Sequence, residues 1–461
     1  MLNLLKKYYP VRNVLFVLGE GLLIFLTINL VYVLFTGWGI YRIDCFPDAV
    51  RALIVTVVFQ VCLYFFDLYD LSVINTELAD WFSRIMQAFG IGCIILAGIY
   101  YFMPQVVIST RIFWTSYFII CCAIILWRLL YFRILNERLF SQPVLIIGTG
   151  TLAADIAREI EDKKDSGYRI AAFVGQTEPE HNPNNAPLLA DSSSLVEHCL
   201  ALEVGRIIIA LDDRRGTMPV RDLLRCKLQG VEIDEGITFY EAVTGKILVE
   251  KVKPGWLIFS EGFKAGKIRV VIKRIMDFLL SISGLLVSLP VTLPAALLIK
   301  LESPGPIFYC QERVGERGNS FKVIKFRSMR QDAEKNGAVW AMENDPRVTR
   351  VGAFIRKTRI DEIPQMWNVL RGEMSFVGPR PERPVFVDKL TNVIPYYSLR
   401  HAVKPGITGW AQVCYPYGAS EEDALRKLEY DLYYIKNMSF FIDILIVFRT
   451  VKTILFRKGS R

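Results

Sequence analysis

The stretch KRIMDFLLSISGLLVSLPVTLPAALLIKLESPGP (residues 273–306) contains an apolar run, residues 278–299, that is long enough to cross a bilayer as a helix. Pro290 and Pro294 lie in the middle of this run. A proline in a helix interior removes one backbone hydrogen bond and destabilises the helix by ~3 kcal/mol or more. In hydrocarbon the freed carbonyl needs another partner, and the Ser288 hydroxyl is a nearby candidate donor.

The charges on either side of this run favour a helix that enters the membrane and returns. Lys273 and Arg274 precede the run, and Lys300 and Arg313 follow it. Basic residues mark the cytoplasmic side of a membrane, so both ends are expected on that side. A bent, re-entrant helix pair over residues 273–300 satisfies both observations. The alternative is a kinked fifth transmembrane span.

Four further apolar segments precede the α/β part of the chain, and each has about the ~20 residues that a transmembrane helix needs. They cover residues 14–35, 49–66, 81–102 and 112–130. The basic residues at the two ends of this region are Lys6, Lys7, Arg12, Arg128, Arg133 and Arg138. Residues 1–139 are therefore predicted to form four transmembrane helices with both ends in the cytoplasm.

Residues 140–250 are predicted to form a Rossmann-like α/β domain, because strand-like and helix-like stretches alternate there. In PVLIIGTGTLAADIAREI (residues 143–160), Gly148, Gly150 and Ala153 match the G-x-G-x-x-[GA] pattern between a strand and a helix. No acidic residue ends a clear second strand about twenty residues later. Nucleotide binding at Gly148 and Gly150 is one interpretation, and a structural or regulatory domain is the other.

Composition excludes several classes of function. Of the 461 residues, 52% are hydrophobic, and the net charge is +9, which suits anionic lipid or phosphorylated substrates. Arginine-rich tracts interleaved with aromatics are missing, so nucleic acid is not an expected partner. Nine cysteines form no CxxC pair, and three histidines leave little for a metal site or a catalytic triad.

The stretch TRIDEIPQMWNVLRGEMSFVGPRP (residues 358–381) carries the candidate catalytic residues, Asp361 and Glu362. Proline is tolerated in the first helical turn, so Pro364 predicts a helix that begins near residues 360–363. The two acids then lie beside unpaired N–H groups, a setting that favours ionised carboxylates and phosphate. Adjacent helical side chains point about 100° apart, so one acid can face a reacting centre while the other holds a metal ion.

Cations around this stretch exceed what two carboxylates need. They are Lys325, Arg327, Arg356, Arg359 and Arg380. Arginine forks match phosphate oxygens, and carboxylates among many cations indicate a diphosphate bridged by a divalent ion, usually Mg²⁺. Lys325, Arg327, Arg356 and Arg380 are therefore the candidate substrate-binding residues.

The C-terminal two-fifths closely resembles the bacterial sugar transferase family, the monotopic polyprenyl-phosphate sugar-1-phosphate transferases, or phosphoglycosyl transferases. The resemblance covers about residues 271–457 and rests on KRIMDFLL, KLESPGPIFYCQERVG, FKVIKFRSMR, RVTRVGAFIRKTRIDEIPQMWNVLRGEMSFVGPRPERP and KPGITGWAQV. It implies a catalytic α/β domain, residues 251–461, with interfacial amphipathic helices and a re-entrant helix that breaks at a Ser-Pro pair. Here Pro290 matches the proline, whereas Leu289 occupies the serine position and Ser288 lies one residue earlier. The preceding regions resemble the large members that start exopolysaccharide, capsule or O-antigen assembly.

The resemblance also implies a two-step covalent reaction at the cytoplasmic face of the bacterial inner membrane. Asp361 would attack the β-phosphorus of a UDP-sugar and release UMP, and undecaprenyl phosphate would then take the sugar-1-phosphate. Glu362 would bind Mg²⁺, while Lys325, Arg356 and Arg380 grip the phosphates. A homodimer is compatible with the sequence.

Two alternatives stay open at this point. A lipid-linked glycosyltransferase would release UDP, although the D-x-D motif that usually holds a nucleotide diphosphate is missing from the sequence. A non-catalytic membrane scaffold or nucleotide sensor is the other.

The C-terminal segment SFFIDILIVFRTVKTILFRKGSR (residues 439–461) is expected in the membrane interface. Its basic residues, expected to face headgroups, are Arg449, Lys452, Arg457 and Lys458.

Overall fold

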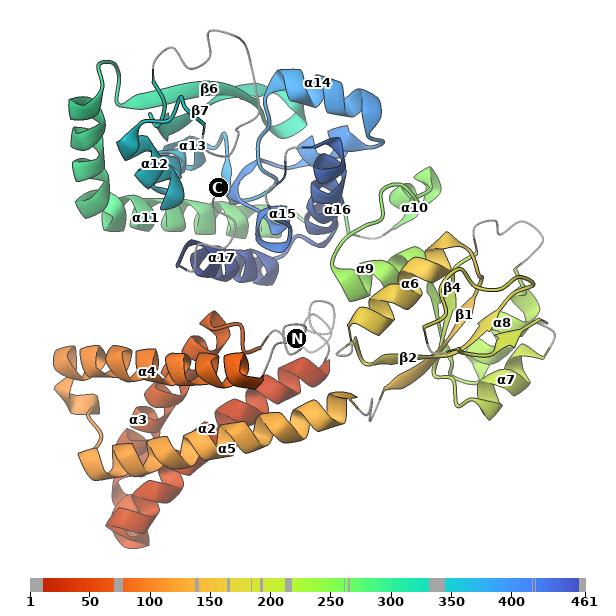
Figure 1. Ribbon diagram of the computed structural model, residues 1–461, viewed down its shortest axis with the longest axis horizontal. Helices are drawn as coiled ribbons and strands as arrows, with labels where there is room; N and C mark the ends of the chain where they lie inside the picture. Colours follow the sequence, from red (N-terminus) through yellow and green to blue (C-terminus); the bar gives the residue numbers. More distant parts are fainter. Residues whose placement is uncertain are drawn as a thin grey trace. The chain divides into compact units, whose positions relative to one another are not determined.

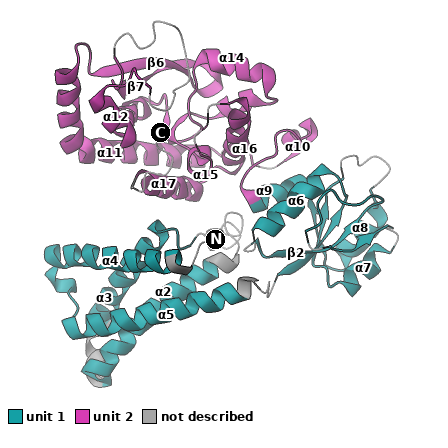
Figure 2. Cartoon of the chain, viewed as in Figure 1, with its two compact units in different colours: residues 1–243 teal, residues 244–461 magenta. Residues whose placement is uncertain are grey.

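The chain forms two compact units, residues 1–243 and 244–461 (Figure 2). The computed structural model describes residues 11–69, 78–136, 141–163, 166–183, 185–190, 194–211, 218–260, 262–263, 266–330, 345–416, 418 and 420–455. The break between the units follows Val243, whereas residue 250 is the predicted end of the α/β domain. Each unit has its own buried hydrophobic clusters.

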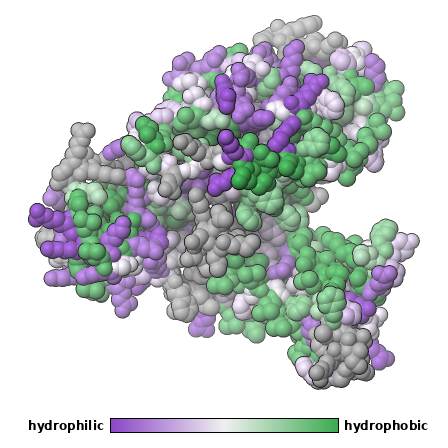
Figure 3. Space-filling view, turned by 180° about the vertical axis from the view of Figure 1, so that it is seen from behind, coloured by the Kyte–Doolittle hydropathy of each residue, from purple (hydrophilic) through white to green (hydrophobic). Residues whose placement is uncertain are grey.

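The first unit begins with four long apolar helices, as predicted. They are α2 (Val11–Thr36), α3 (Trp38–Phe65), α4 (Leu78–Phe102) and α5 (Thr110–Asn136). Ile24, Phe59 and Phe89 pack in the centre of the bundle, while leucines such as Leu18 and Leu22 are exposed. The coloured face of these helices that Figure 3 shows is largely hydrophobic. Helices that are apolar on the outside as well as the inside suit a lipid environment, and the protein is a multi-pass membrane protein.

A buried ion pair joins the first and last of these helices. Arg128 of α5 binds both carboxylate oxygens of Glu20 of α2, at 2.7 and 2.8 Å, and also the carbonyl of Leu68 at 2.5 Å. Glu20 is 0% exposed and Arg128 is 5% exposed. Arg128 was predicted as a cytoplasmic flanking charge and lies instead inside the bundle. Of the other charges behind that prediction, Lys6, Lys7 and Arg138 lie outside the described residues.

The α/β domain has a five-stranded parallel sheet in the order β3-β2-β1-β4-β5, which confirms the Rossmann-like fold. The strands are β1 (Gln142–Ile147), β2 (Tyr168–Val174), β3 (Leu188–Leu189), β4 (Arg206–Ile209) and β5 (Glu232–Glu235). The helices are α6 (Thr151–Asp162), α7 (Leu195–Ala201), α8 (Val220–Leu228) and α9 (Gly236–Thr244). Strand β1 is central, and its apolar run from Val144 to Ile147 is buried on both faces.

The second unit surrounds two small sheets with helices (Figure 1). An antiparallel pair consists of β6 (Phe308–Val314) and β7 (Ser320–Phe326), and a parallel pair consists of β8 (Ser375–Val377) and β9 (Gly406–Thr408). The helices are α10 (Pro254–Phe259), α11 (Lys267–Glu302), α12 (Arg350–Lys357), α13 (Gln365–Arg371), α14 (Pro384–Val393), α15 (Trp410–Cys414), α16 (Glu421–Asn437) and α17 (Phe440–Leu455).

Helix α11 contains the apolar run with Pro290 and Pro294, and it is mostly exposed, including Val287 at 79%. Figure 1 shows that α11 changes direction sharply between its two halves. The Ser288 hydroxyl donates to the carbonyl of Leu285 at 3.0 Å, one residue before the carbonyl that Pro290 leaves free. By length and composition alone, α11 is a fifth candidate membrane span beside α2 to α5.

Three polar residues in the first half of α11 attach it to the rest of the unit. Lys273 donates to the carbonyl of Val377 at 3.0 Å and pairs with Asp443 of α17 at 2.9 Å. Arg274 donates to two carbonyls at the end of α13, and Asp277 accepts from the Phe376 N–H and the Ser375 hydroxyl. The KRIMD motif therefore fixes the apolar helix to the elements that carry the acidic pair.

Helix α17 packs one face on the unit and exposes the other. Ile442 and Ile446 are buried, whereas Phe441, Ile444 and Phe448 are 39–44% exposed. Arg449 departs from the prediction that it faces headgroups. Its guanidinium lies 4.9 Å from the centre of the Trp410 ring and donates to the Cys414 thiol. Arg457 and Lys458 lie outside the described residues.

Candidate active site

Asp361 and Glu362 lie in a short 3-10 turn, Ile360–Glu362, that precedes α13. We predicted that they begin the helix itself; instead Pro364 caps α13 and the acids form a separate turn. Arg359 enters this turn with φ 58°, a left-handed backbone that non-glycine residues seldom adopt. The turn directs both acids inward, since Asp361 is only 7% exposed and Glu362 8% exposed.

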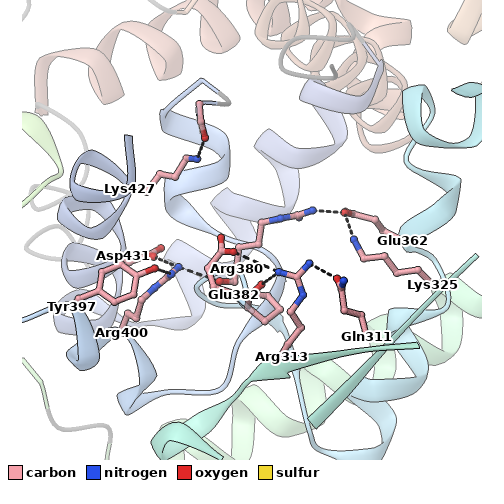
Figure 4. A network of polar contacts seen from close by, with 12 residues as sticks. Gln311, Arg313, Lys325, Glu362, Arg380, Glu382, Tyr397, Arg400, Lys427 and Asp431 are labelled. Carbon is pink, nitrogen blue, oxygen red and sulfur yellow. Dashed lines mark hydrogen bonds and ion pairs between the residues drawn. The ribbon is translucent and has the colours of Figure 1, made fainter. Parts of the chain in front are cut away.

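Glu362 is surrounded by cations (Figure 4). Its Oε1 atom lies 3.1 Å from Lys325 Nζ, 2.5 Å from an Arg380 nitrogen and 3.9 Å from Arg359. Burial alone would raise the pKa of Glu362, but Arg380, Lys325 and Arg359 hold that pKa well below its usual value. Glu362 is therefore ionised throughout the physiological pH range.

The pKa of Asp361 shifts in the opposite direction. Burial, followed by the neighbouring Glu362 charge, raises its pKa to about 6, although Lys325, Arg359 and Arg356 oppose the shift. Its Oδ1 atom is buried and accepts no hydrogen bond from the described residues. An unsatisfied buried carboxylate oxygen is energetically unfavourable, so it is a natural position for a ligand or a reacting atom.

The oxygen chemistry here suits Mg²⁺. Within the described residues no three His, Cys, Asp or Glu side chains cluster as metal ligands. Mg²⁺, however, is commonly held by one or two carboxylates together with water and substrate phosphates. The two acids have one unsatisfied oxygen, Asp361 Oδ1, and three cations lie beside Glu362. Asp361 and Glu362 therefore fit that arrangement once a diphosphate is bound.

Lys325 reaches Glu362 because α13 is joined to β7. The Asn368 side chain of α13 donates to the Lys322 carbonyl at 2.8 Å and accepts from the Ile324 N–H at 3.0 Å. Asn368 is fully buried and thereby takes the place of a neighbouring strand along β7. Burial lowers the pKa of Lys325, and the nearby Glu362 charge opposes that shift.

Arg356 and Arg380 also lie at the acids. Arg356, in the last turn of α12, donates to the Ser328 hydroxyl at 2.9 Å and lowers the pKa of Asp361. Arg380 follows β8 and binds Glu362 directly. The structure thus gathers Lys325, Arg356 and Arg380, which are far apart in the sequence, around the acidic pair.

Arg327 has a different position from the one predicted. Its guanidinium donates to the carbonyls of Ile299, Ser303 and Pro304 at 3.3, 2.7 and 2.8 Å, and its side chain is 6% exposed. These contacts close the C-terminal end of α11. Because the carbonyls at a helix end need donors, we reassign Arg327 from substrate binding to supporting α11.

Sequence reasoning missed a second group of residues behind Arg380. Arg400, Tyr397 and Asp431 are each 2–6% exposed. Arg400 donates hydrogen bonds to Tyr397 and Asp431 and also to the Arg380 carbonyl (Figure 4). They lie 17–51 positions after Arg380 in sequence, outside any recognisable spacing. Only the buried charge of an arginine and an aspartate could have drawn attention to them.

In the α/β domain, Gly148 has φ +122°, and a Cβ atom there would lie 2.4 Å from the Ala210 carbonyl oxygen. Close approach of two strand ends therefore accounts for Gly148 without a ligand. Gly150 caps α6 with an ordinary extended backbone and no side-chain cap. Nucleotide binding at this loop stays a prediction.

Comparison with known proteins agrees with this architecture. The family described as bacterial sugar transferase matches residues 268–457, and a CoA-binding domain family matches residues 64–228. The chain is 46% identical over 241 residues to the UDP-N-acetylgalactosamine-undecaprenyl-phosphate N-acetylgalactosaminephosphotransferase of Aeromonas hydrophila, covering 52% of this chain and 56% of that protein.

Two shorter relatives are covered more completely. An exopolysaccharide production protein of Rhizobium leguminosarum is 44% identical over 191 residues, which is 40% of this chain and 94% of that protein. A putative undecaprenyl-phosphate N-acetylgalactosaminyl 1-phosphate transferase of Bacillus subtilis is 58% identical over 131 residues, covering 28% of this chain and 73% of that protein. The chain belongs to the bacterial sugar transferase family.

Proposed function

We propose that this protein transfers sugar-1-phosphate from a UDP-sugar to undecaprenyl phosphate and releases UMP. The observation that carries the proposal is the buried, unpartnered Oδ1 of Asp361 beside Glu362 and its ring of cations. The names of two relatives, which describe undecaprenyl-phosphate sugar phosphotransferases, support the same class of reaction. The reaction would be the first membrane step of exopolysaccharide, capsule or O-antigen synthesis.

In the first half-reaction, a carboxylate oxygen of Asp361 attacks the β-phosphorus of the UDP-sugar. The bond from that phosphorus to the bridging oxygen breaks, and UMP leaves with the bridging oxygen and its electron pair. In the second half-reaction, a phosphate oxygen of undecaprenyl phosphate attacks the same phosphorus and the Asp361 carboxylate leaves. The products are UMP and undecaprenyl diphosphate-sugar, so every atom and charge is accounted for.

The side chains supply position and charge, because a carboxylate is a weak nucleophile. Lys325, Arg356 and Arg380 are placed to bind phosphate oxygens as negative charge shifts toward the leaving group. Glu362 fixes Lys325 and Arg380 through the ion pairs described above. Mg²⁺ bound at Glu362 would neutralise the diphosphate.

The membrane arrangement is part of the proposal. We propose that α11 dips into the cytoplasmic leaflet of the inner membrane, bends at Ser288 and Pro290, and returns without crossing. A lipid phosphate acceptor is available only at the membrane surface, and the Lys273, Arg274 and Asp277 contacts attach the apolar helix to the elements beside the acids. Self-association as a homodimer stays a prediction.

The nucleotide product tests the proposed function. Purified protein would be incubated with UDP-glucose or UDP-N-acetylgalactosamine, with and without undecaprenyl phosphate and Mg²⁺, and the products separated. We expect UMP in an amount equal to the lipid-linked sugar. Release of UDP would instead identify a glycosyltransferase, and unchanged polymer production in an Asp361→Asn strain would identify a non-catalytic scaffold.

A further inference from the structure

The backbone that carries Arg380 is held at four consecutive carbonyl groups. Those of Pro379 and Glu382 accept from the N–H groups of Gly406 and Val314, both at 2.9 Å. Those of Arg380 and Pro381 accept from the guanidinium groups of Arg400, at 3.0 Å, and Arg313, at 3.2 Å. Proline has no N–H, so Pro379 and Pro381 can be fixed by backbone hydrogen bonds only through their carbonyls.

Two arginines, Arg313 and Arg400, hold this segment, and Arg400 is the more deeply buried. It lies in the 3-10 helix Tyr397–Ala402, is 6% exposed, and donates to the Tyr397 hydroxyl at 2.7 Å and to Asp431 of α16 at 2.8 Å. Asp431 and Tyr397 are each 2% exposed. The guanidinium charge is therefore neutralised inside the fold, and its remaining hydrogen-bonding capacity is directed at the Arg380 backbone.

We infer that Arg400, oriented by Tyr397 and Asp431, is a positioning residue that sets where the Arg380 guanidinium meets Glu362. It touches the Arg380 carbonyl on one side of the segment, while the Arg380 side chain reaches Glu362 on the other (Figure 4). This inference rests on the proposed function, in which Arg380 binds phosphate. Arg400 itself acts only through Arg380.

A purely structural role for the buried pair is the competing explanation. Buried ion pairs can often be replaced by apolar residues without loss of stability, so burial alone does not reveal a function. The hydrogen bond to the Arg380 carbonyl distinguishes the two roles. Lysine in place of Arg400 keeps the positive charge but loses the planar guanidinium group, which binds Tyr397, Asp431 and the Arg380 carbonyl at once. Misplacing a catalytic group by about 1 Å can lower a rate by about 10²-fold.

The test is a double-mutant cycle in the full-length protein, with UMP release from UDP-glucose or UDP-N-acetylgalactosamine, whichever the wild type uses faster. We expect Arg400→Lys to lower kcat by about tenfold in the wild-type background and by less than about twofold in the Arg380→Lys background. A structural defect would lower kcat by the same factor in both backgrounds, and that result would overturn the inference. Arg426→Lys is the matched control, since Arg426 pairs with buried Glu429 on α16 away from this segment.

Hydrogen–deuterium exchange gives a readout that does not depend on activity. We expect Arg400→Lys and the milder Tyr397→Phe to speed amide exchange at Gly406 and Val314, whose N–H groups donate to the Pro379 and Glu382 carbonyls, and Arg426→Lys to leave it unchanged. If exchange there is unaffected by Arg400→Lys and Tyr397→Phe, Arg400 does not hold the segment. Absence of UMP from the wild type would contradict the proposed function alone, because the exchange result stands on its own.

Discussion

Asp361 and Glu362 are adjacent in one 3-10 turn and equally buried, yet their pKa values shift in opposite directions. Lys325, Arg380 and Arg359 gather on Glu362 Oε1, and the Asp361 Oδ1 atom is left without a hydrogen bond from the described residues. The turn therefore separates a permanently charged acid from one that titrates near neutrality, and such separation assigns different roles to two similar groups.

The transfer rate should depend on the ionisation of Asp361. Its pKa is raised to about 6, and only the carboxylate can attack phosphorus. We expect kcat/KM, which reports the pKa of the free enzyme, to be constant above about pH 7 and to fall as the pH decreases through about 6. The pH profile of UMP release checks this, and a rate that rises toward pH 5 would contradict a carboxylate nucleophile.

Replacing Asp361 should remove activity and increase stability at alkaline pH. The folded pKa lies above the unfolded value, so the folded state binds more protons between about pH 4 and 6, and stability decreases as pH rises through that window. Above it, the ionised Asp361 costs on the order of 2 to 3 kcal/mol. We expect Asp361→Asn to melt at a higher temperature than wild type at pH 8, with the difference vanishing near pH 4. Asp388→Asn, at an exposed position, is the control.

Glu362→Gln should weaken the response to Mg²⁺. Loss of the charge removes the group that pairs with Lys325 and Arg380 and the proposed metal ligand. We expect a rate at least about tenfold lower and a higher Mg²⁺ concentration for half-maximal rate. A titration with MgCl₂ measures both, with the exposed Glu312→Gln as control. Unchanged Mg²⁺ dependence would remove Glu362 from the metal site.

The same variant should shift the acidic limb of the pH profile. The Glu362 charge is one of the causes that raise the pKa of Asp361. Its removal should therefore lower that pKa and move the fall in rate to a lower pH. An acidic limb at the wild-type position would show that the two carboxyls are not coupled.

Cys310 reports on the path of α11. It is exposed in β6, shortly after α11 ends, and a variant that keeps only this cysteine can be labelled with a membrane-impermeant maleimide. We expect labelling in inside-out vesicles and none in intact spheroplasts. Replacing Pro290 and Pro294 by alanine restores two backbone donors and should straighten α11, so that Cys310 becomes accessible from outside. Outside labelling of the unmodified helix would contradict the re-entrant arrangement.

The stability of the N-terminal bundle should depend on Glu20 and Arg128 being present together. Glu20→Gln leaves a buried arginine without its counter-charge, and such a change typically destabilises by about 3 to 5 kcal/mol. Replacing both residues by methionine should be less harmful than the sum of the single changes. Melting in detergent, followed by intrinsic tryptophan fluorescence, tests this expectation.

Periodicity and composition were enough to predict the four helices and the parallel α/β sheet, because each leaves a local pattern. The failures involve long-range contacts. Residues two apart in a strand face the same side, so the sequence pattern groups Arg327 with Lys325. Arg327, however, lies just after the end of β7, and its guanidinium binds carbonyls at the end of α11. Arg400 and Asp431 were missed because only the folded backbone brings them to Arg380.

The side chain of Asn368 has an effect beyond placing Lys325. A two-stranded hairpin has open edges, and an open edge can recruit a strand from another molecule and start aggregation. Asn368 occupies the Lys322 carbonyl and the Ile324 N–H on β7, two adjacent docking points that an incoming strand would use. Asn368, which helps to place Lys325 at the acidic turn, thus also protects the edge of β7 from pairing with a strand of a neighbouring molecule in the membrane.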